Sequence, residues 1–323
     1  MAAGGAEHMT AVALPDPAAV PAIEFRDVTK SYGPVRALDG VDLQVRRGEI
    51  FGFLGPNGAG KTTAIRILVD LLRPDRGTVS VLGLDAQAEG VEVRRHIGYL
   101  AADRHLYEQL TAQQLFDYVD ALRGGAVDRD YLQSLVDRLQ LERDRRIGTL
   151  SSGNRQKVGL IQALMARPEV VILDEPTSGL DPLMQEVVEQ ILREIAADGR
   201  TVFFSSHVLA EVEQLCNRAA ILRAGRVVDV FDLAEQRRLA PLRMEVTFDV
   251  PPPRDAFAAL TGVAVLATPG ATVVLDVRDG FDELIKCLAR YTVEHIESRQ
   301  PTLEEMFLTY YEDPEVEPAE EER

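Results

Sequence analysis

The amino-acid sequence predicts an α/β fold built on a largely parallel sheet, followed by a small α+β domain. Two continuous apolar runs, Val170–Leu173 and Thr201–Phe204, are typical of parallel strands that are covered on both faces. A glycine-rich segment separates a third apolar run, Ile50–Leu54, from a helical pattern, as in a strand–loop–helix unit. Strands that alternate with helices in this way indicate an α/β architecture.

The N-terminal part of the chain adds further elements. Residues 1–20 are rich in Ala and Pro without periodicity, and we expect them to form a disordered lead. Ile23–Phe25 and Val41–Val45 alternate apolar and polar residues, as half-buried antiparallel strands do. Four apolar residues between positions 65 and 72 have the i, i+3, i+4, i+7 spacing of an amphipathic helix.

The second half of the chain changes in pattern. Helical periodicity dominates residues 108–145, and a different order begins after residue 228. The elements expected there are a strand (243–249), a helix (254–260), two strands (262–266 and 271–277), a helix (280–290) and a strand (293–299). This order suggests a ferredoxin-like α+β domain. A last helix, Thr302 to Tyr311, would begin with a capping box, and the acidic residues 312–323 would form a solvated tail.

Composition narrows the class of protein. The net charge is −17 and the isoelectric point about 4.8, so we expect no nucleic-acid partner, because such proteins usually carry a basic face. The longest apolar candidate, Leu260–Leu275, is broken by Pro269 and is too short for a membrane span. The first Lys or Arg is Arg26, so the N-terminus lacks the layout of a secretory signal. Cys216 and Cys287 are expected to be buried, reduced thiols of a cytosolic protein.

The glycine-rich segment matches the phosphate-binding pattern G-x-x-x-x-G-K-[ST]. Its residues are Gly55, Pro56, Asn57, Gly58, Ala59, Gly60, Lys61 and Thr62, and Thr63 follows them. Gly58 and Gly60 would let backbone N–H groups approach phosphate oxygens, and the following helix would add its positive dipole end. Lys61 would contact the β- and γ-phosphates of ATP, and the Thr62 hydroxyl would be a ligand of Mg²⁺. A glycine-rich turn that binds no ligand is the alternative interpretation.

Polar residues at the ends of other strands should face the same nucleotide. Asp174 and Glu175 follow a buried run, and ligands of open α/β sheets bind at the carboxyl ends of the strands. Asp174 fits a carboxylate on the Mg²⁺ side, and Glu175 fits the general base that polarises the attacking water. His207 closes another strand and is a candidate to contact the γ-phosphate, and Tyr32 is a candidate to stack on adenine. The alternatives are a helix N-terminus, a structural histidine and a surface tyrosine.

Together these motifs resemble the ABC ATPase family over residues 23–228. Leu150–Asn154 resembles the LSGGQ signature of that family, and the segment that ends at Asp181 resembles its D-loop. The resemblance implies that Ser151 and the Gly153 amide bind the γ-phosphate of an ATP held by a second subunit, and that the Asp181 segment takes part in the same dimer contact. Without the other motifs, this segment would only predict a helix cap.

The resemblance also implies a domain plan. A nucleotide-binding domain (21–230) would combine a mixed-sheet core, an antiparallel β subdomain and a helical subdomain (about 85–165), and a small domain (240–311) would follow.

The sequence departs from the family pattern at two places. Ser152 and Asn154 stand where Gly and Gln are usual in the signature. After Gly98–Leu100, Ala102 occupies the position of a Gln that senses Mg²⁺, water and the transmembrane partner. Alanine offers no side-chain hydrogen bond, and the neighbouring Asp103 is the one residue nearby that offers a replacement. This departure bears on coupling to the partner more than on hydrolysis.

A narrower resemblance points to the ATPases of ABC-2-type exporters, including bacterial drug exporters. It rests on Ile97–Tyr107 and Pro301–Leu308. The implied protein is an ATPase at the cytoplasmic face of the cell membrane, with a transmembrane permease on a separate chain. A second ABC subunit, a copy of this chain or a different cassette, would complete it. A soluble ABC ATPase acting on DNA or the ribosome, and a regulatory protein without turnover, are the alternatives.

The segment after Ala102 is a candidate for docking the permease. Tyr107, Leu110 and Phe116 are the apolar residues that would anchor it. The alternative interpretation is that these three side chains belong to the core of the helical subdomain.

Overall fold

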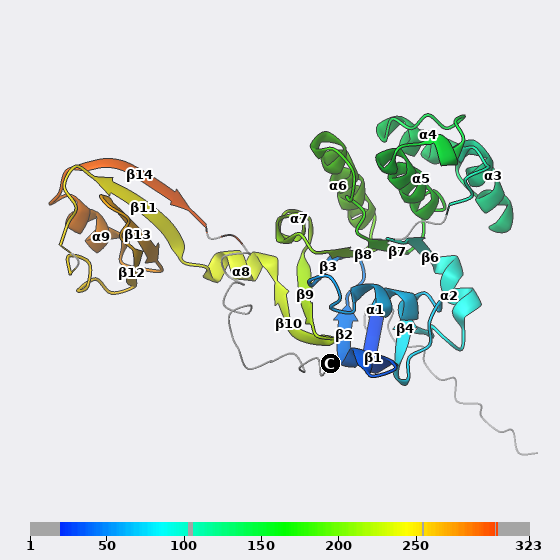
Figure 1. Cartoon of the computed structure of the whole chain (residues 1–323), viewed down its shortest axis with the longest axis horizontal. Helices are drawn as coiled ribbons and strands as arrows, with labels where there is room; N and C mark the ends of the chain where they lie inside the picture. The colour runs from blue at the N-terminus through cyan, green and yellow to red at the C-terminus, as the bar shows by residue number, and fades with distance from the viewer. Residues whose placement is uncertain (1–19, 103–105, 254, 301, 303–323) are drawn as a thin grey trace, which may run out of the picture. The chain divides into compact units, whose positions relative to one another are not determined.

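The computed structural model describes residues 20–102, 106–253, 255–300 and 302 (Figure 1). These residues form two compact units, one up to His207 with Arg218–Val230, the other Val208–Asn217 with the residues from Phe231 onward. The expectations for residues 1–19, for a helix from Thr302 to Tyr311 and for the acidic tail concern residues outside the described part of the chain.

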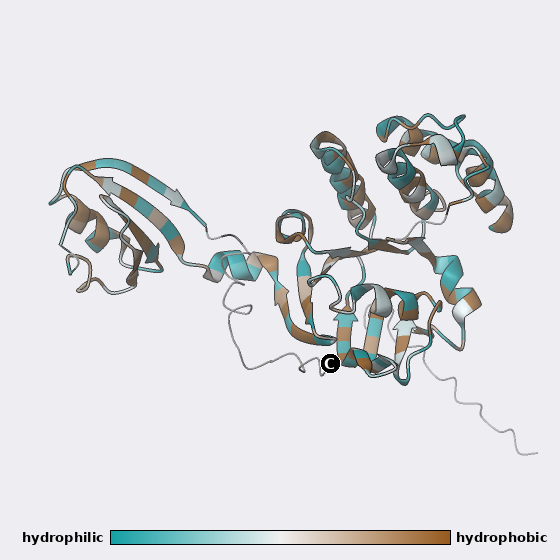
Figure 2. Ribbon diagram, in the orientation of Figure 1, coloured by the Kyte–Doolittle hydropathy of each residue, from teal (hydrophilic) through white to brown (hydrophobic). Residues whose placement is uncertain are grey.

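A six-stranded sheet carries the first unit. In spatial order its strands are β10 (Arg226–Asp232), β9 (Arg218–Arg223), β3 (Ile50–Leu54), β8 (Thr201–Ser206), β7 (Val170–Asp174) and β6 (Ile97–Leu100). The strands from β9 to β6 pair in parallel, so their carboxyl ends share one edge of the sheet. β3, β7 and β8 are buried along their whole length, and Figure 2 shows their ribbons as mainly apolar. The parallel sheet predicted from the apolar runs is therefore confirmed.

A second, antiparallel sheet packs on the first together with helix α1 (Figure 1). Its strands, in spatial order, are β2 (Val35–Val45), β1 (Ile23–Tyr32), β4 (Arg76–Val81) and β5 (Leu84–Asp85). One core joins Phe25 of β1, Ile65 of α1 (Lys61–Leu68) and Phe203 of β8. The two antiparallel strands predicted from alternation are confirmed, although both are longer than expected.

Helix α1 ends earlier than its apolar spacing predicted. The pattern extends to residue 72, but the helix stops at Leu68. Asp70 takes a left-handed conformation (φ 57°), and the amides of Leu71 and Leu72 donate to the Arg66 carbonyl oxygen. Both bonds go to one carbonyl group in the last turn, so the helix terminates there while Leu72 still packs against the core.

The first unit has further helices before, within and after the predicted helical stretch, residues 108–145. They are α2 (Gly90–His96), α3 (Ala112–Leu122), α4 (Arg129–Arg138), the short 3₁₀ turn η2 (Ile147–Thr149), α5 (Ser152–Leu164) and α6 (Pro182–Ala197). Within residues 108–145 the chain forms two helices, because Gly124 and Gly125 both have positive φ, 85° and 73°, and interrupt the helix between them. The described residues contain no helix that is both long and apolar enough to cross a membrane.

The second unit contains another antiparallel sheet. The elements of this unit are α7 (Leu209–Leu215), α8 (Leu233–Leu239), β11 (Leu242–Phe248), β12 (Val263–Ala267), β13 (Thr272–Val277), α9 (Phe281–Leu288) and β14 (Val293–Arg299). The strands lie in the order β12-β13-β11-β14, and α9 packs on one face of the sheet through Leu284. Cys216 and Cys287 are both buried, as expected, and no disulfide joins them. All four strands and α9 were predicted to within two residues.

The prediction of a helix over residues 254–260 is wrong for residues 255–260, the part of this segment that the structure describes. Residues 255–259 form turns, in which Ala256, Ala258 and Leu260 donate backbone hydrogen bonds to residues three positions earlier. Three successive prolines, residues 251–253, precede these turns, and each proline restricts the residue before it to an extended conformation. Packing of Phe257 against Phe248 then anchors the segment to the core of the sheet (ring centroids 6.4 Å apart).

Candidate functional site

The loop between β3 and α1 requires glycine. Gly60 has φ 109°, and a Cβ at this position would lie 2.4 Å from the Ala37 carbonyl oxygen. A side chain is therefore excluded there both by conformation and by space. Gly60 is also the N-cap residue of α1, so the helix begins at Lys61. The N–H groups of the first helical turn have no intrahelical acceptor, and together with the helix dipole they favour an anion.

A cavity of 420 Å³ lies in front of this loop, at the carboxyl ends of the parallel strands. The predicted site residues that line it are Pro56, Asn57, Gly58, Gly60, Lys61, Thr62, Thr63, Asp174, Glu175 and His207. Ala37, Ala102 and Ser178 also line it. The structure thus brings the phosphate-loop residues, the acidic pair and the histidine to one cavity, whose volume is ordinary for a small-molecule site.

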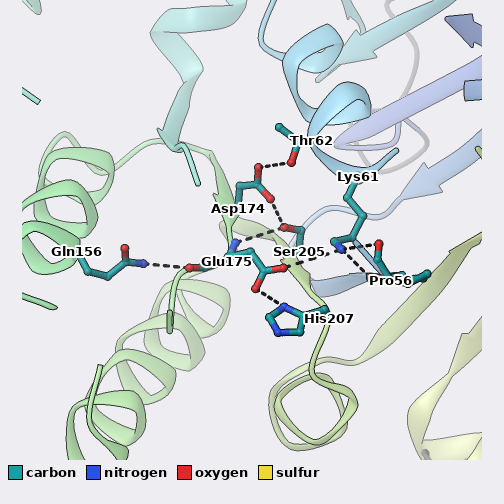
Figure 3. A network of polar contacts seen from close by, with 9 residues as sticks. Pro56, Lys61, Thr62, Gln156, Asp174, Glu175, Ser205 and His207 are labelled. Atoms are coloured by element: carbon teal, nitrogen blue, oxygen red, sulfur yellow. Dashed lines mark hydrogen bonds and ion pairs between the residues drawn. The ribbon is translucent and has the colours of Figure 1, made fainter. Parts of the chain in front are cut away.

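Asp174 is held at the cavity by two hydroxyl groups (Figure 3). The Thr62 hydroxyl donates to Asp174 Oδ2 (3.0 Å), and the Ser205 hydroxyl donates to Asp174 Oδ1 (2.6 Å). Both Asp174 and Ser205 are buried. Because each carboxylate oxygen accepts a hydrogen bond, the charge of Asp174 is stabilised and its orientation is fixed.

Glu175 adopts a left-handed backbone conformation (φ 54°) that is unusual for a residue with a side chain. Its N–H donates to the Ser205 carbonyl oxygen (3.2 Å) and hydroxyl (3.3 Å). Its carboxylate lies 2.8 Å from His207 Nδ1 and 3.9 Å from Lys61 Nζ. Such a conformation costs about 1–3 kcal/mol and persists only where surrounding contacts hold it.

Lys61 is the cation of the cavity, and only 6% of it is exposed. Its ammonium group donates to the carbonyl oxygens of Gly55 (2.6 Å) and Pro56 (3.3 Å). Burial lowers the pKa of Lys61, while the nearby carboxylates of Glu175 and Asp174 oppose that shift. A buried cation beside a ring of backbone N–H groups makes this end of the cavity suited to phosphate.

Six of the predicted site residues lie outside this cavity lining, and two of them, Gly55 and Ala59, belong to the phosphate loop itself. Tyr32 is at the end of β1 with 47% of its surface exposed. Ser151 caps α5 by accepting from the Asn154 amide (3.3 Å), and Gly153 lies in the first turn of that helix. Asp181 caps α6 by accepting from the Met184 amide (3.0 Å). Within one chain, Ser151 and Asp181 therefore have structural contacts.

Ala102 lines the cavity, as expected for the position that carries Gln in the family pattern. Asp103, the possible replacement, is outside the described residues. For the docking segment, Phe116 is fully buried and is core, so that part of the hypothesis is wrong. Tyr107 is exposed and packs edge-on against Tyr118, so it stays a candidate, whereas Leu110 is half-buried.

Sequence reasoning missed Ser205 and Gln156. Ser205 lies at the end of β8 and contacts both acidic residues, and Gln156 of α5 donates to the backbone of Glu175. The Ser205-Ser206 pair that ends an otherwise apolar run was the available signal for the first. No local pattern marks Gln156, because its partner lies 19 residues away.

A phosphate loop that faces two carboxylates across the ends of parallel strands defines a nucleoside-triphosphate-hydrolysing protein of the phosphate-loop class. Comparison with known proteins gives the family. A family model described as "ABC transporter" matches residues 38–178.

Among similar proteins, daunorubicin resistance ATP-binding protein DrrA3 of Streptomyces coeruleorubidus is 35% identical over 304 residues, which cover 89% of this chain and 95% of that protein. Bacitracin transport ATP-binding protein BcrA of Bacillus licheniformis is 34% identical over 70% of this chain and 75% of that protein. A solved ATP-binding subunit of an ABC transporter aligns with a TM-score of 0.62 at 31% identity, covering 67% of this chain and 92% of its own. The dimeric bacterial ABC transporter cassette MJ0796 aligns with a TM-score of 0.61 at 27% identity. The alignment covers 65% of this chain and 98% of that cassette.

The chain therefore belongs to the ABC transporter ATP-binding proteins, and it has the ABC cassette fold with its mixed sheet and antiparallel subdomain. It is an ATPase subunit that hydrolyses ATP for transport. The resemblance noted in the sequence is confirmed.

The position of Lys61 leads to a prediction about affinity. Lys61→Ala should weaken ATP binding roughly 10- to 100-fold, because a charge-assisted contact with phosphate is lost. Titration with a fluorescent ATP analogue measures this change, and Lys157→Ala, which lies outside the cavity lining, is the matched control. Equal affinities for the Lys61 variant and the wild type would mean that the cavity is not the nucleotide site.

Proposed function

We propose that this subunit powers export of a drug-like or peptide compound through a permease on a separate chain, working as a dimer with a second copy of itself. The observation that carries the ATP-driven part of the proposal is the cavity in which Lys61, Glu175 and His207 meet. Relatives named for daunorubicin resistance and bacitracin transport support the direction and the class of cargo. We place its site of action at the cytoplasmic face of the membrane, where ATP is available.

In the proposed reaction, the phosphates of ATP bind the N–H groups at the start of α1, and Lys61 neutralises the β- and γ-phosphates. Glu175 accepts a proton from the water that attacks the γ-phosphorus, and the bond to the bridging oxygen breaks so that ADP leaves with the electron pair. His207, held by Glu175 at 2.8 Å, offers its other ring nitrogen to the γ-phosphate. Tyr32 is proposed to stack on the adenine.

The residues present also fit a magnesium ion. The Thr62 hydroxyl and the Asp174 carboxylate, 3.0 Å apart, provide the oxygen ligands that Mg²⁺ prefers. Mg²⁺ commonly takes one or two protein oxygens and completes its shell with water and substrate phosphates, so no larger carboxylate cluster is needed. When bound, the ion neutralises phosphate charge, while Ser205 keeps Asp174 oriented toward it.

The proposal of a dimer rests on predicted site residues that do not line the nucleotide cavity of their own chain. Ser151 and Gly153 present a hydroxyl and an amide at the start of α5, and Asp181 starts α6. We propose that the first two bind the γ-phosphate of an ATP held by the partner subunit, and that the Asp181 segment contacts the same interface. A similar cassette that is dimeric supports this assembly.

Residues 240–311, which include the sheet of the second unit, are proposed to form a ferredoxin-like domain after a nucleotide-binding domain over 21–230. The strand order β12-β13-β11-β14, with β11 and β13 at its centre, supports this assignment. Turns at residues 255–259 would take the place of the first helix of that fold.

Replacing the proposed base tests the hydrolysis mechanism. Glu175→Gln keeps the shape of the side chain but cannot accept the proton, so turnover should fall roughly 10²- to 10⁴-fold while ATP binding persists. Steady-state phosphate release and nucleotide titration measure the two effects. Glu142→Gln, the same change at an exposed position, serves as the control. Wild-type turnover in Glu175→Gln would sink the assignment of this residue as base.

Association tests the shared site. In the Glu175→Gln background, ATP should convert the chain to a dimer, and adding Ser151→Arg should prevent it, because a long cation would fill the γ-phosphate position. Light scattering with and without ATP measures the mass, and Ser134→Arg on the exposed face of α4 is the matched control. A Glu175→Gln chain that stays monomeric with saturating ATP would count against the shared site.

A further inference from the structure

Gln156 is a buried amide that the proposed reaction does not use. It lies on α5 with 1% of its surface exposed. Its Nε2 donates to the carbonyl oxygens of Glu175 (3.1 Å) and Pro176 (2.5 Å), as Figure 3 shows for Glu175. The side chain therefore connects helix α5 to the backbone immediately after β7.

Only the NH₂ group of the Gln156 amide forms hydrogen bonds among the described residues. The Oε1 atom of Gln156 is buried and has no hydrogen-bond partner among the described residues. An unpaired buried acceptor destabilises the folded chain, whereas an apolar side chain of the same length would avoid that cost. The two bonds donated by Nε2 must offset it, so the contact with the backbone of Glu175 and Pro176 is the contribution that this residue makes.

The backbone that Gln156 holds is the strained part of the site. Glu175, at φ 54°, is fixed on one side by Ser205, which accepts from its N–H. On the other side, its carbonyl oxygen accepts from Gln156 and from the Ser178 amide (3.3 Å). Both ends of the residue are thus clamped, which is the condition under which a left-handed conformation persists.

A second contact joins the same helix to the same loop. A Cβ on Gly153 would lie 2.7 Å from the Gly179 carbonyl oxygen, so the first turn of α5 rests directly on the loop backbone. Gln156 follows three residues later, on the same side of the helix. The loop from Glu175 to Gly179 therefore contacts α5 at two places.

We infer that Gln156 is a positioning residue that sets the direction of the Glu175 carboxylate from the placement of helix α5. The inference rests on the proposed role of Glu175 and extends it. Because α5 starts at Ser151, which is proposed to face the partner's ATP, binding there acts on the general base of this chain. ATP bound in the partner's site thereby changes the orientation of the Glu175 carboxylate in this chain's own site.

Gln156→Met tests the inference, because it keeps length and burial but removes the donor. In the full chain, kcat should fall roughly 10- to 100-fold, as expected for a misplaced catalytic group, with the ATP Kd within about twofold of wild type. Hydrogen exchange of the backbone amides of residues 175–180, measured without ATP, should become roughly 10-fold faster as the clamp is lost. Gln87→Met is the matched control, since Gln87 Nε2 also donates to a backbone carbonyl, that of Ile67 (3.0 Å).

A pH profile separates donation from packing. In Gln156→Glu the introduced carboxyl faces two carbonyl oxygens in a buried place, which raises its pKa, and only its protonated form donates. The ratio of its kcat to that of wild type should therefore be highest at low pH and fall as pH rises through that pKa. A ratio that does not change with pH would overturn the inference.

The other outcomes are equally distinct. Equal kcat and equal exchange in Gln156→Met and Gln87→Met would overturn the positioning role, and so would a fall in kcat with unchanged exchange of residues 175–180. Normal turnover in Glu175→Gln would instead remove the base assignment. Exchange in Gln156→Met, measured without ATP, would still report whether α5 holds this loop.

Discussion

The parallel pairing of β3, β8 and β7 is the constraint on which the rest of the structure depends. Its register sets Leu54 beside Ser206 and Asp174 beside Ser205, so the phosphate loop and the acidic pair emerge at one edge of the sheet. The hydrogen bond from the Ser205 hydroxyl to Asp174 then ties the ends of two strands together. A shift by one residue along β7 or β8 would turn Asp174 or Ser205 to the opposite face of the sheet, and the polar lining of the cavity would be lost.

Charge and strain are concentrated at that edge. Lys61, Asp174 and Glu175 lie close together in a partly buried place, where unpaired charges would be costly and paired ones act strongly. Glu175 adds a left-handed backbone that needs support from Ser205 and, on our inference, from Gln156. Both features destabilise an isolated site, and in the proposed reaction they favour hydrolysis because the side chains are oriented before ATP binds.

How far the sequence predicted this arrangement depends on the distance between interacting residues. The phosphate loop and the Asp174–Glu175 pair were predicted because each is a local pattern whose place at a strand end follows from the α/β rule. Ser205 and Gln156 were missed because their partners lie 31 and 19 residues away, where no local pattern reports them. The helix expected at 254–260 failed because so short a stretch does not distinguish a helix from successive turns, and residues 255–259 form turns that bury Phe257.

The proposed dimer encloses each ATP between two copies of the chain. The decisive experiment is the structure of the Glu175→Gln chain with ATP and Mg²⁺. We expect a two-fold dimer in which each γ-phosphate contacts Lys61 of one copy and Ser151 of the other, with Thr62 and Asp174 on the magnesium side. A structure in which each ATP contacts residues of a single copy only, with Ser151 far from either nucleotide, would contradict it.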